Sequence, residues 1–66
     1  MKNGNYYEEQ GDKLFGEKRY KEAERAYLHA MDDFAGAITA ENQSLDNYKR
    51  VLHKHISTLE KITGNE

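Results

Sequence analysis

The sequence predicts an all-α fold, an antiparallel up-down-up bundle of three helices. Apolar residues recur at spacings of three and four in three separate segments, and this spacing marks one face of an α-helix. The 66 residues contain no proline, so no helix interior is interrupted, and only short polar stretches separate the segments. Short connections place neighbouring helices antiparallel. No segment shows the alternating β-branched residues that are typical of a strand.

The first helix is expected over residues 6–17. Asn5 precedes it as a suitable N-cap, and Glu8 follows three residues later, as in a capping box. Gly11 and Leu14 are three residues apart, so they share one face of this helix. We expect that face to pack against the next helix.

The second helix, over residues 21–41, has the most regular apolar pattern in the chain. Its central stripe repeats at helical spacing: Ala23, Tyr27, Ala30, Phe34 and Ile38. A smooth row of alanines flanks the stripe on one side: Ala26, Ala30 and Ala37. A second row flanks it on the other side: Leu28, Met31 and Ala35. An apolar face this wide usually packs against two neighbours, so we expect the alanine side to meet the first helix and the other side the third.

The third helix is expected over residues 45–63. Ser44 is a plausible N-cap, and Gly64 is well placed to end the helix in a left-handed conformation. The apolar stripe again follows spacings of three and four: Leu45, Tyr48, Leu52, His55, Leu59 and Ile62. Val51 and Ile56 widen this stripe.

The charge balance argues against a nucleic-acid-binding protein. Ten Lys and Arg residues and twelve Asp and Glu residues give a formal net charge of −2, whereas such proteins usually carry a basic face. Lys49, Arg50 and Lys54 are expected on the solvent side of the third helix, with their aliphatic stems over apolar surface. We therefore expect no nucleic-acid partner.

No segment is apolar enough to insert into a membrane. No run approaches the ~18 apolar residues of a transmembrane helix, and the first residues lack the pattern of a signal peptide. The chain has no cysteine, which fits a reducing compartment. We expect a cytoplasmic protein that does not insert directly into a membrane.

Catalytic or metal-binding sets are not visible in the sequence. His53 and His55 are two residues apart on a helix, so they point about 200° away from each other and cannot share one metal ion. The carboxylates are scattered over all three helices, and no phosphate-binding loop or Ser-His-Asp order is present. We expect no enzymatic activity, no metal site and no cofactor.

Residues 11–31 resemble the helical pair of a tetratricopeptide (TPR) repeat. Gly11 is the small residue of the first helix, and Tyr20 lies in the turn. A small–aromatic–small order follows in the second helix: Ala23, Tyr27 and Ala30. Lys18 stands where the repeat has its turn glycine. TPR arrays need about three repeats to bury their faces, and this sequence has one such pair.

The wider stretch 7–62 resembles the MIT domain, the microtubule-interacting and trafficking module. That family is a three-helix bundle in which the first two helices resemble a TPR pair and the second helix is longer. The matching positions in the second helix are Tyr20, Ala23, Tyr27, Ala30, Phe34, Ile38 and Glu41. Those in the third helix are Ile56, Leu59 and Glu60. The resemblance therefore implies a TPR-like and MIT-like fold.

The resemblance implies a protein-interaction module. Members of the family bind amphipathic helical C-terminal motifs of ESCRT-III-type subunits and recruit larger proteins to membrane-trafficking or remodelling sites. For this chain it implies a monomeric module of a larger protein, peripheral to endosomal membranes. Some members also bind extended proline-containing segments between the first and third helices. Here that groove would involve Tyr7, Leu14, Phe15 and the Val51 side of the third helix.

The wide apolar faces predict where a helical partner binds. Helices two and three carry more apolar residues than a bundle of this size buries, and exposed apolar strips tend to mark partner sites. We therefore predict a groove between these two helices. The partner-binding residues are expected to be Leu28, Met31, Asp32, Ala35, Ile38, Tyr48, Leu52, His55, Ile56 and Glu60. Asp32 and Glu60 would lie on the rim and pair with Lys or Arg of the ligand.

Two other interpretations fit the same pattern. The chain could be a TPR fragment or the capping repeat of a TPR array, in which case neighbouring repeats cover the apolar strip. It could also be a self-associating structural bundle, in which case a second copy covers Met31 and its neighbours. Sedimentation at several concentrations separates the self-associating bundle from an open groove.

Overall fold

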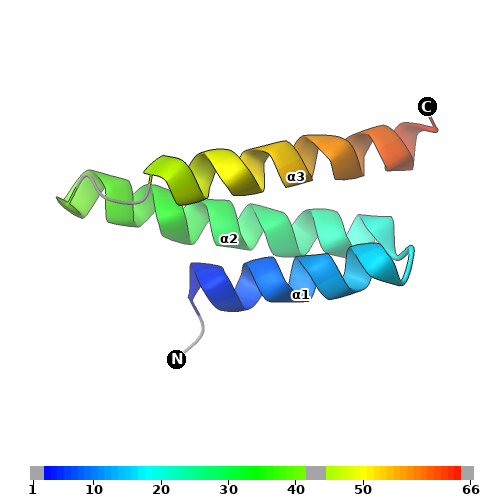
Figure 1. The fold of residues 1–66 in the computed structure, drawn as a ribbon, viewed down its shortest axis with the longest axis horizontal. Helices are drawn as coiled ribbons and strands as arrows, with labels where there is room; N and C mark the ends of the chain where they lie inside the picture. The colour runs from blue at the N-terminus through cyan, green and yellow to red at the C-terminus, as the bar shows by residue number, and fades with distance from the viewer. Residues whose placement is uncertain (1–2, 42–44, 65–66) are drawn as a thin grey trace.

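The computed structural model describes the backbone of residues 3–41 and 45–64, and the side chains of residues 3–36 and 45–64. Three helices follow one another: α1 (Gly4–Gly16), α2 (Tyr20–Glu41) and α3 (Leu45–Thr63). They run antiparallel, and α2 lies between α1 and α3 (Figure 1). The prediction of an all-α, up-down-up three-helix bundle is confirmed. The proposed N-cap Ser44 lies outside the described residues.

The N-terminus of α1 differs from the prediction. The N-cap is Asn3, whose side-chain oxygen accepts a hydrogen bond from the backbone N–H of Tyr6 at 3.0 Å. The helix begins at Gly4, whose N–H donates to Asp33 Oδ2 of α2 at 2.8 Å. The capping box of Asn5 and Glu8 is therefore wrong, and the cause is tertiary: α2 supplies the acceptor that fixes the first turn.

The turn between α1 and α2 contains a residue in the left-handed conformation. Lys18 has a φ of 65°, and its N–H donates to the carbonyl of Phe15 at 3.0 Å. The N–H of Arg19 donates to the carbonyl of Leu14 at 2.9 Å, so the two bonds form a Schellman motif. Lys18 thus occupies the position that glycine favours in such a motif. Gly64 ends α3 with a φ of 80°, as predicted.

The core is built mainly by α2. Its buried residues and one residue of α3 form a single cluster: Ala23, Tyr27, Ala30, Phe34 and Val51. Gly11 of α1 allows close approach, because a Cβ atom built there would lie 2.5 Å from the Tyr27 ring. Ala26 is also buried. The small–aromatic–small order therefore brings the backbones of α1 and α2 together.

The buried line of α3 is rotated relative to the predicted stripe. Val51 and Thr58 are fully buried, and His55 is buried with them. Leu52 is half-buried and Leu59 is exposed. Thr58 enters the interior because its hydroxyl donates to the carbonyl of Lys54 at 2.8 Å, which satisfies the polar atom within its own helix. As a result, part of the leucine stripe of α3 faces outward.

Candidate functional site

Large apolar side chains remain exposed along α2 and α3. Four of them are between 40% and 46% exposed: Leu28, Leu45, Ile56 and Leu59. Together with the half-buried Leu52 they form a surface that we call the α2–α3 seam. A cluster of exposed leucine and isoleucine side chains is the kind of surface that proteins use for binding other proteins.

The seam residues of α3 form one stripe on the side away from α1. Along the chain they are seven, four and three residues apart, which places them on one helical face. The opposite side of α3 faces α1, because Arg50 and Lys54 both contact Glu8 there. The seam therefore lies on the face of the molecule that α1 does not cover.

A contact between Glu24 and His55 places Leu28 beside α3. Glu24 Oε2 of α2 lies 3.0 Å from His55 Nε2 of α3. Leu28 follows Glu24 by four residues, so it lies one turn further along the same side of α2. Leu28 consequently belongs to the same surface as the stripe of α3. The Glu24–His55 contact also fixes which levels of the two antiparallel helices lie side by side.

Eight of the ten predicted partner-binding residues fall into three groups. Leu28 and Ile56 are exposed in the seam, and Asp32 and Glu60 are exposed charged residues. The half-buried group consists of Met31, Ala35, Tyr48 and Leu52. Within this group Met31 and Tyr48 pack against the core cluster. Met31 is thus partly accessible rather than enclosed.

Two predicted residues do not contribute a described surface. His55 is only 9% exposed and lies beneath the seam, in contact with Glu24. The side chain of Ile38 lies outside the described residues. The structure thus brings Leu28, Leu52 and Ile56 to one surface and places His55 under it.

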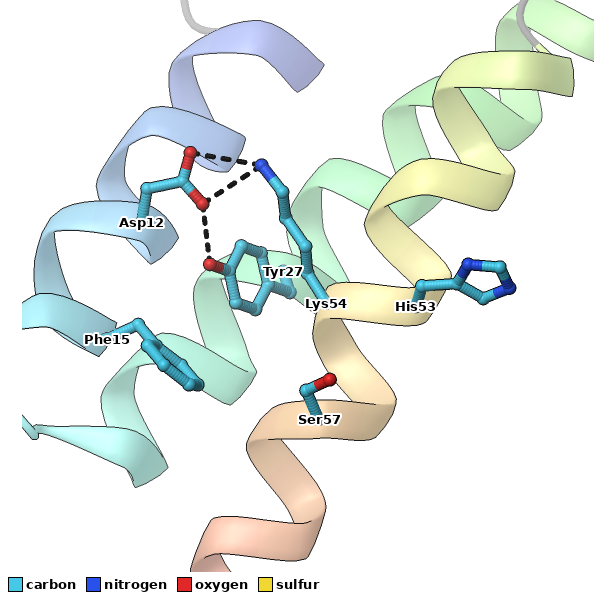
Figure 2. Close-up of a pocket in the computed structure, with 6 residues that line it drawn as sticks. All are labelled: Asp12, Phe15, Tyr27, His53, Lys54 and Ser57. Carbon is cyan, nitrogen blue, oxygen red and sulfur yellow. Dashed lines mark hydrogen bonds and ion pairs between the residues drawn. The ribbon is translucent and has the colours of Figure 1, made fainter.

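A second feature, an ionic cluster, joins α1 to α3. Glu8 accepts hydrogen bonds from Arg50 Nε and Nη2, each at 2.7 Å, and from Lys54 Nζ at 2.7 Å. Lys54 Nζ also lies 3.1 Å from both carboxylate oxygens of Asp12. Tyr27 of α2 donates its hydroxyl to Asp12 at 2.7 Å, so all three helices meet in one network (Figure 2).

The network shifts the titration of two buried groups. The hydrogen bond from Arg50 lowers the pKa of Glu8 to about 2, with help from Lys54 and against the opposing effect of burial. Burial, followed by the hydrogen bond to Asp12, raises the pKa of Tyr27 well above its ordinary value. Glu8 is therefore a carboxylate that the fold keeps ionised, and the cluster is a stabilising contact between α1 and α3.

A pocket of about 360 Å³ lies beside this cluster, between α1 and α3. Its lining residues are Asp12, Phe15, Tyr27, His53, Lys54 and Ser57. In Figure 2 the Lys54 side chain reaches from α3 to Asp12, whereas the His53 ring points away from both. Phe15, which was predicted to contribute to a groove between the first and third helices, does line this pocket. The pocket and the seam are separate surfaces.

Comparisons with protein-family models, curated proteins and solved structures find no match to this chain. Functional inference therefore rests on the seam, the ionic cluster and the pocket.

The ionic cluster is the main feature that sequence reasoning missed. Arg50 is exposed, as expected, and Lys54 is half-buried, but their bonds to Glu8 of α1 were not predicted. A signal was present in the sequence: Glu8 and Asp12 are four residues apart, as are Arg50 and Lys54. Two acids on one helix face and two bases on another are typical of helices that pack side by side.

Among the side chains that the structure describes, those of residues 3–36 and 45–64, no group of three or more His, Cys, Asp or Glu residues is arranged to hold a metal ion. No helix within residues 3–41 and 45–64 is long and apolar enough to cross a membrane.

Proposed function

We propose that this chain is a protein-interaction module that binds an amphipathic helix along the α2–α3 seam. The observation that carries the proposal is the exposure of Leu28, Ile56 and Leu59, each 40% to 45% accessible on one surface. A partner helix with leucines at spacings of three and four would cover these side chains and add a fourth helix to the bundle.

Apolar burial would supply most of the affinity. Completing the burial of one half-exposed leucine or isoleucine is worth roughly 1 kcal/mol, since full burial is worth about 1.5–3 kcal/mol. We expect micromolar binding, on the order of −8 kcal/mol, which requires further contacts along the partner helix, because a few apolar contacts of this size do not by themselves offset the cost of association. The unbranched side chain of Met31, half-buried next to the seam, can adapt its shape to incoming leucines.

Charged residues at the edge of the seam would tune specificity. Asp32 and Glu60 are exposed and would pair with Lys or Arg of the partner. Each exposed ion pair contributes only about 0.2–1 kcal/mol, so these charges select among partners rather than provide the affinity.

We further propose that the module is MIT-like and that its partners are the helical C-terminal tails of ESCRT-III-type subunits. The small–aromatic–small packing of α1 on α2 and the long α2 support this proposal, as does a third helix whose outer stripe stays exposed. In this role the chain would bring a larger protein to trafficking or remodelling sites, in the cytoplasm and peripheral to endosomal membranes. It would act as a binding module and not as an enzyme.

A capping position in a TPR array is the main alternative. In such an array the neighbouring repeat would cover the seam permanently, and isolated peptides would not compete for it. Flanking TPR repeats in the parent protein would favour this alternative.

Fluorescence anisotropy with labelled leucine-rich tail peptides tests the proposal. Leu28→Ser and Ile56→Ser should each weaken binding roughly tenfold, because each removes about 1–1.5 kcal/mol of apolar contact from the complex. Tyr6→Ser is the matched control, because Tyr6 is a large apolar residue of α1 with 37% exposure. Equal weakening by all three variants, or no binding at millimolar peptide, would reject the proposal.

A further inference from the structure

The edges of the α2–α3 seam carry the same residue pattern on both helices. On α2, Lys21, Leu28 and Asp32 are seven and four residues apart. On α3, Lys49, Ile56 and Glu60 have the same spacings, seven and four. Each set therefore occupies one helical stripe, with a base and an acid about three turns apart and an apolar residue between them.

Because α2 and α3 run antiparallel, the base of one helix lies at the level of the acid of the other. The contact between Glu24 and His55 shows which residues of α2 and α3 lie at the same height along the bundle axis. From this alignment, the heights of Lys21 and Glu60 differ by only about 3 Å. By the same measure, Asp32 lies within about 3 Å of the level of Lys49. Each end of the seam thus carries one positive and one negative charge, on opposite edges.

These four charged side chains are exposed, and none of them forms an ion pair with another residue in the described part of the chain. By contrast, the charged residues that join α1 to α3 are engaged with one another, as Glu8 and Lys54 are. The charges along the seam are therefore available to a molecule that covers it.

We propose that a second copy of this chain covers the seam, in a two-fold arrangement that lays α2 of one copy over α3 of the other. A two-fold rotation about an axis parallel to the helices brings Lys21 of one copy to Glu60 of the other, and Asp32 to Lys49. Each of these pairs then occurs twice, because a two-fold interface repeats every contact. At either end of the seam the positive and negative charges alternate around a square.

The apolar residues agree with the same arrangement. By the same measure, Leu28 lies at the level of residue 51, one residue from Leu52, so it packs over Leu52 of the other copy. The facing helices run antiparallel, which also opposes their dipoles favourably. Arg25, four residues after Lys21 and three before Leu28, lies in the same stripe of α2 and is exposed in the single chain.

Such a dimer would regulate the seam. Because the dimer contact and the proposed peptide contact use the same apolar side chains, a peptide and a second copy exclude each other. Peptide binding would then dissociate the dimer, and the apparent peptide affinity would fall as the protein concentration rises.

Analytical ultracentrifugation of the full chain without peptide tests the dimer. Between about 10 μM and about 1 mM, the range expected for a weak interface, the wild-type mass should rise from one chain toward two. Lys21→Glu should weaken self-association at least tenfold, because it leaves four acids and no base of this set at the Lys21–Glu60 end of the seam. The double variant Lys21→Glu and Glu60→Lys should restore self-association to within about threefold of the wild type.

The control is Lys13→Glu, which makes the same charge change at an exposed position of α1. It should dimerise like the wild type, and circular dichroism should show that all variants stay helical. A wild type that remains monomeric at the highest concentration would overturn the dimer, as would a folded double variant in which self-association is not restored.

The dimer and the peptide site fail separately. Peptide binding is measured on the monomeric variant Lys21→Glu, in which the seam is uncovered. A monomeric wild type that binds peptide would remove the dimer and leave the proposed function. If the wild type forms a charge-dependent dimer but the monomeric variant binds no peptide, the dimer stands and the proposed function is rejected.

Discussion

The ionic cluster between α1 and α3 makes a prediction about acid stability. Glu8, which is 7% exposed, has a pKa of about 2 in the folded chain, compared with an ordinary value of 4.5. Because the folded pKa lies below the unfolded pKa, the unfolded state takes up the proton first. The stabilisation is therefore complete above about pH 5 and is lost as the pH falls toward 2.

The size of this contribution follows from the shift in the pKa of Glu8. A displacement from 4.5 to about 2 corresponds to about 3 kcal/mol of folding free energy at neutral pH. About 2 kcal/mol of this is already lost at pH 3. For a domain of this size such a loss is a large share of the total stability.

Urea unfolding followed by far-UV circular dichroism, repeated from pH 7 to pH 2, measures this contribution. Glu8→Gln should be about 2–3 kcal/mol less stable than the wild type at pH 7, and the two proteins should converge near pH 2. Glu9→Gln makes the same chemical change at the exposed neighbouring residue, and its stability should follow the wild type at every pH. A constant difference between Glu8→Gln and the wild type across the whole range would refute the assigned role of Glu8.

Two further predictions concern glycine and the left-handed position. Gly11→Ala should destabilise the fold by about 1–3 kcal/mol in urea unfolding, because its methyl group would meet the Tyr27 ring at 2.5 Å. Gly36→Ala adds a methyl group with nothing within 4 Å, so it should instead stabilise α2 by about 0.5–1 kcal/mol. If Gly11→Ala and Gly36→Ala changed the stability in the same direction, the close approach of α1 to α2 would be contradicted. Lys18→Gly should raise the melting temperature by roughly 4–8 °C, since it relieves about 1 kcal/mol at a φ of 65°; an unchanged or lower melting temperature would show that Lys18 is not strained there.

Much of the fold could be predicted because apolar spacing determines which segments are helical. α2 and α3 begin and end within one residue of the predicted limits, since both carry an unbroken helical period. The start of α1 was harder to predict. Asn3 and Asn5 are both good capping residues, and the choice between them depends on Asp33 of α2 accepting the N–H of Gly4.

The rotation of α3 was beyond the sequence pattern for a related reason. Two neighbouring rows of residues on α3, one beginning at residue 51 and one at residue 52, both continue at helical spacing. Periodicity alone therefore does not show which row faces the core. The buried stripe contains Thr58, which a hydrophobic pattern does not mark as interior, and His55, which the predicted stripe included. Their burial depends on partners: Glu24 for His55, and the carbonyl of Lys54 for Thr58.

The candidate site was predicted in part for the same reason. The wide apolar faces correctly indicated that Leu28 and Ile56 exceed what the core buries. The position of His55 beneath this surface follows from the rotation of α3. The charge alternation along the seam emerges only when the antiparallel level of the two helices is known.

A spin-labelled peptide tests the central claim, that the α2–α3 seam receives an amphipathic helix, most directly. A leucine-rich tail peptide carrying a nitroxide at one end is added to the monomeric Lys21→Glu variant, and methyl NMR signals are recorded. The account predicts broadening of the methyl groups of Leu28, Ile56 and Leu59, with little effect on Leu14 of α1. Broadening centred on Leu14, or on no methyl group at saturating peptide, would contradict it.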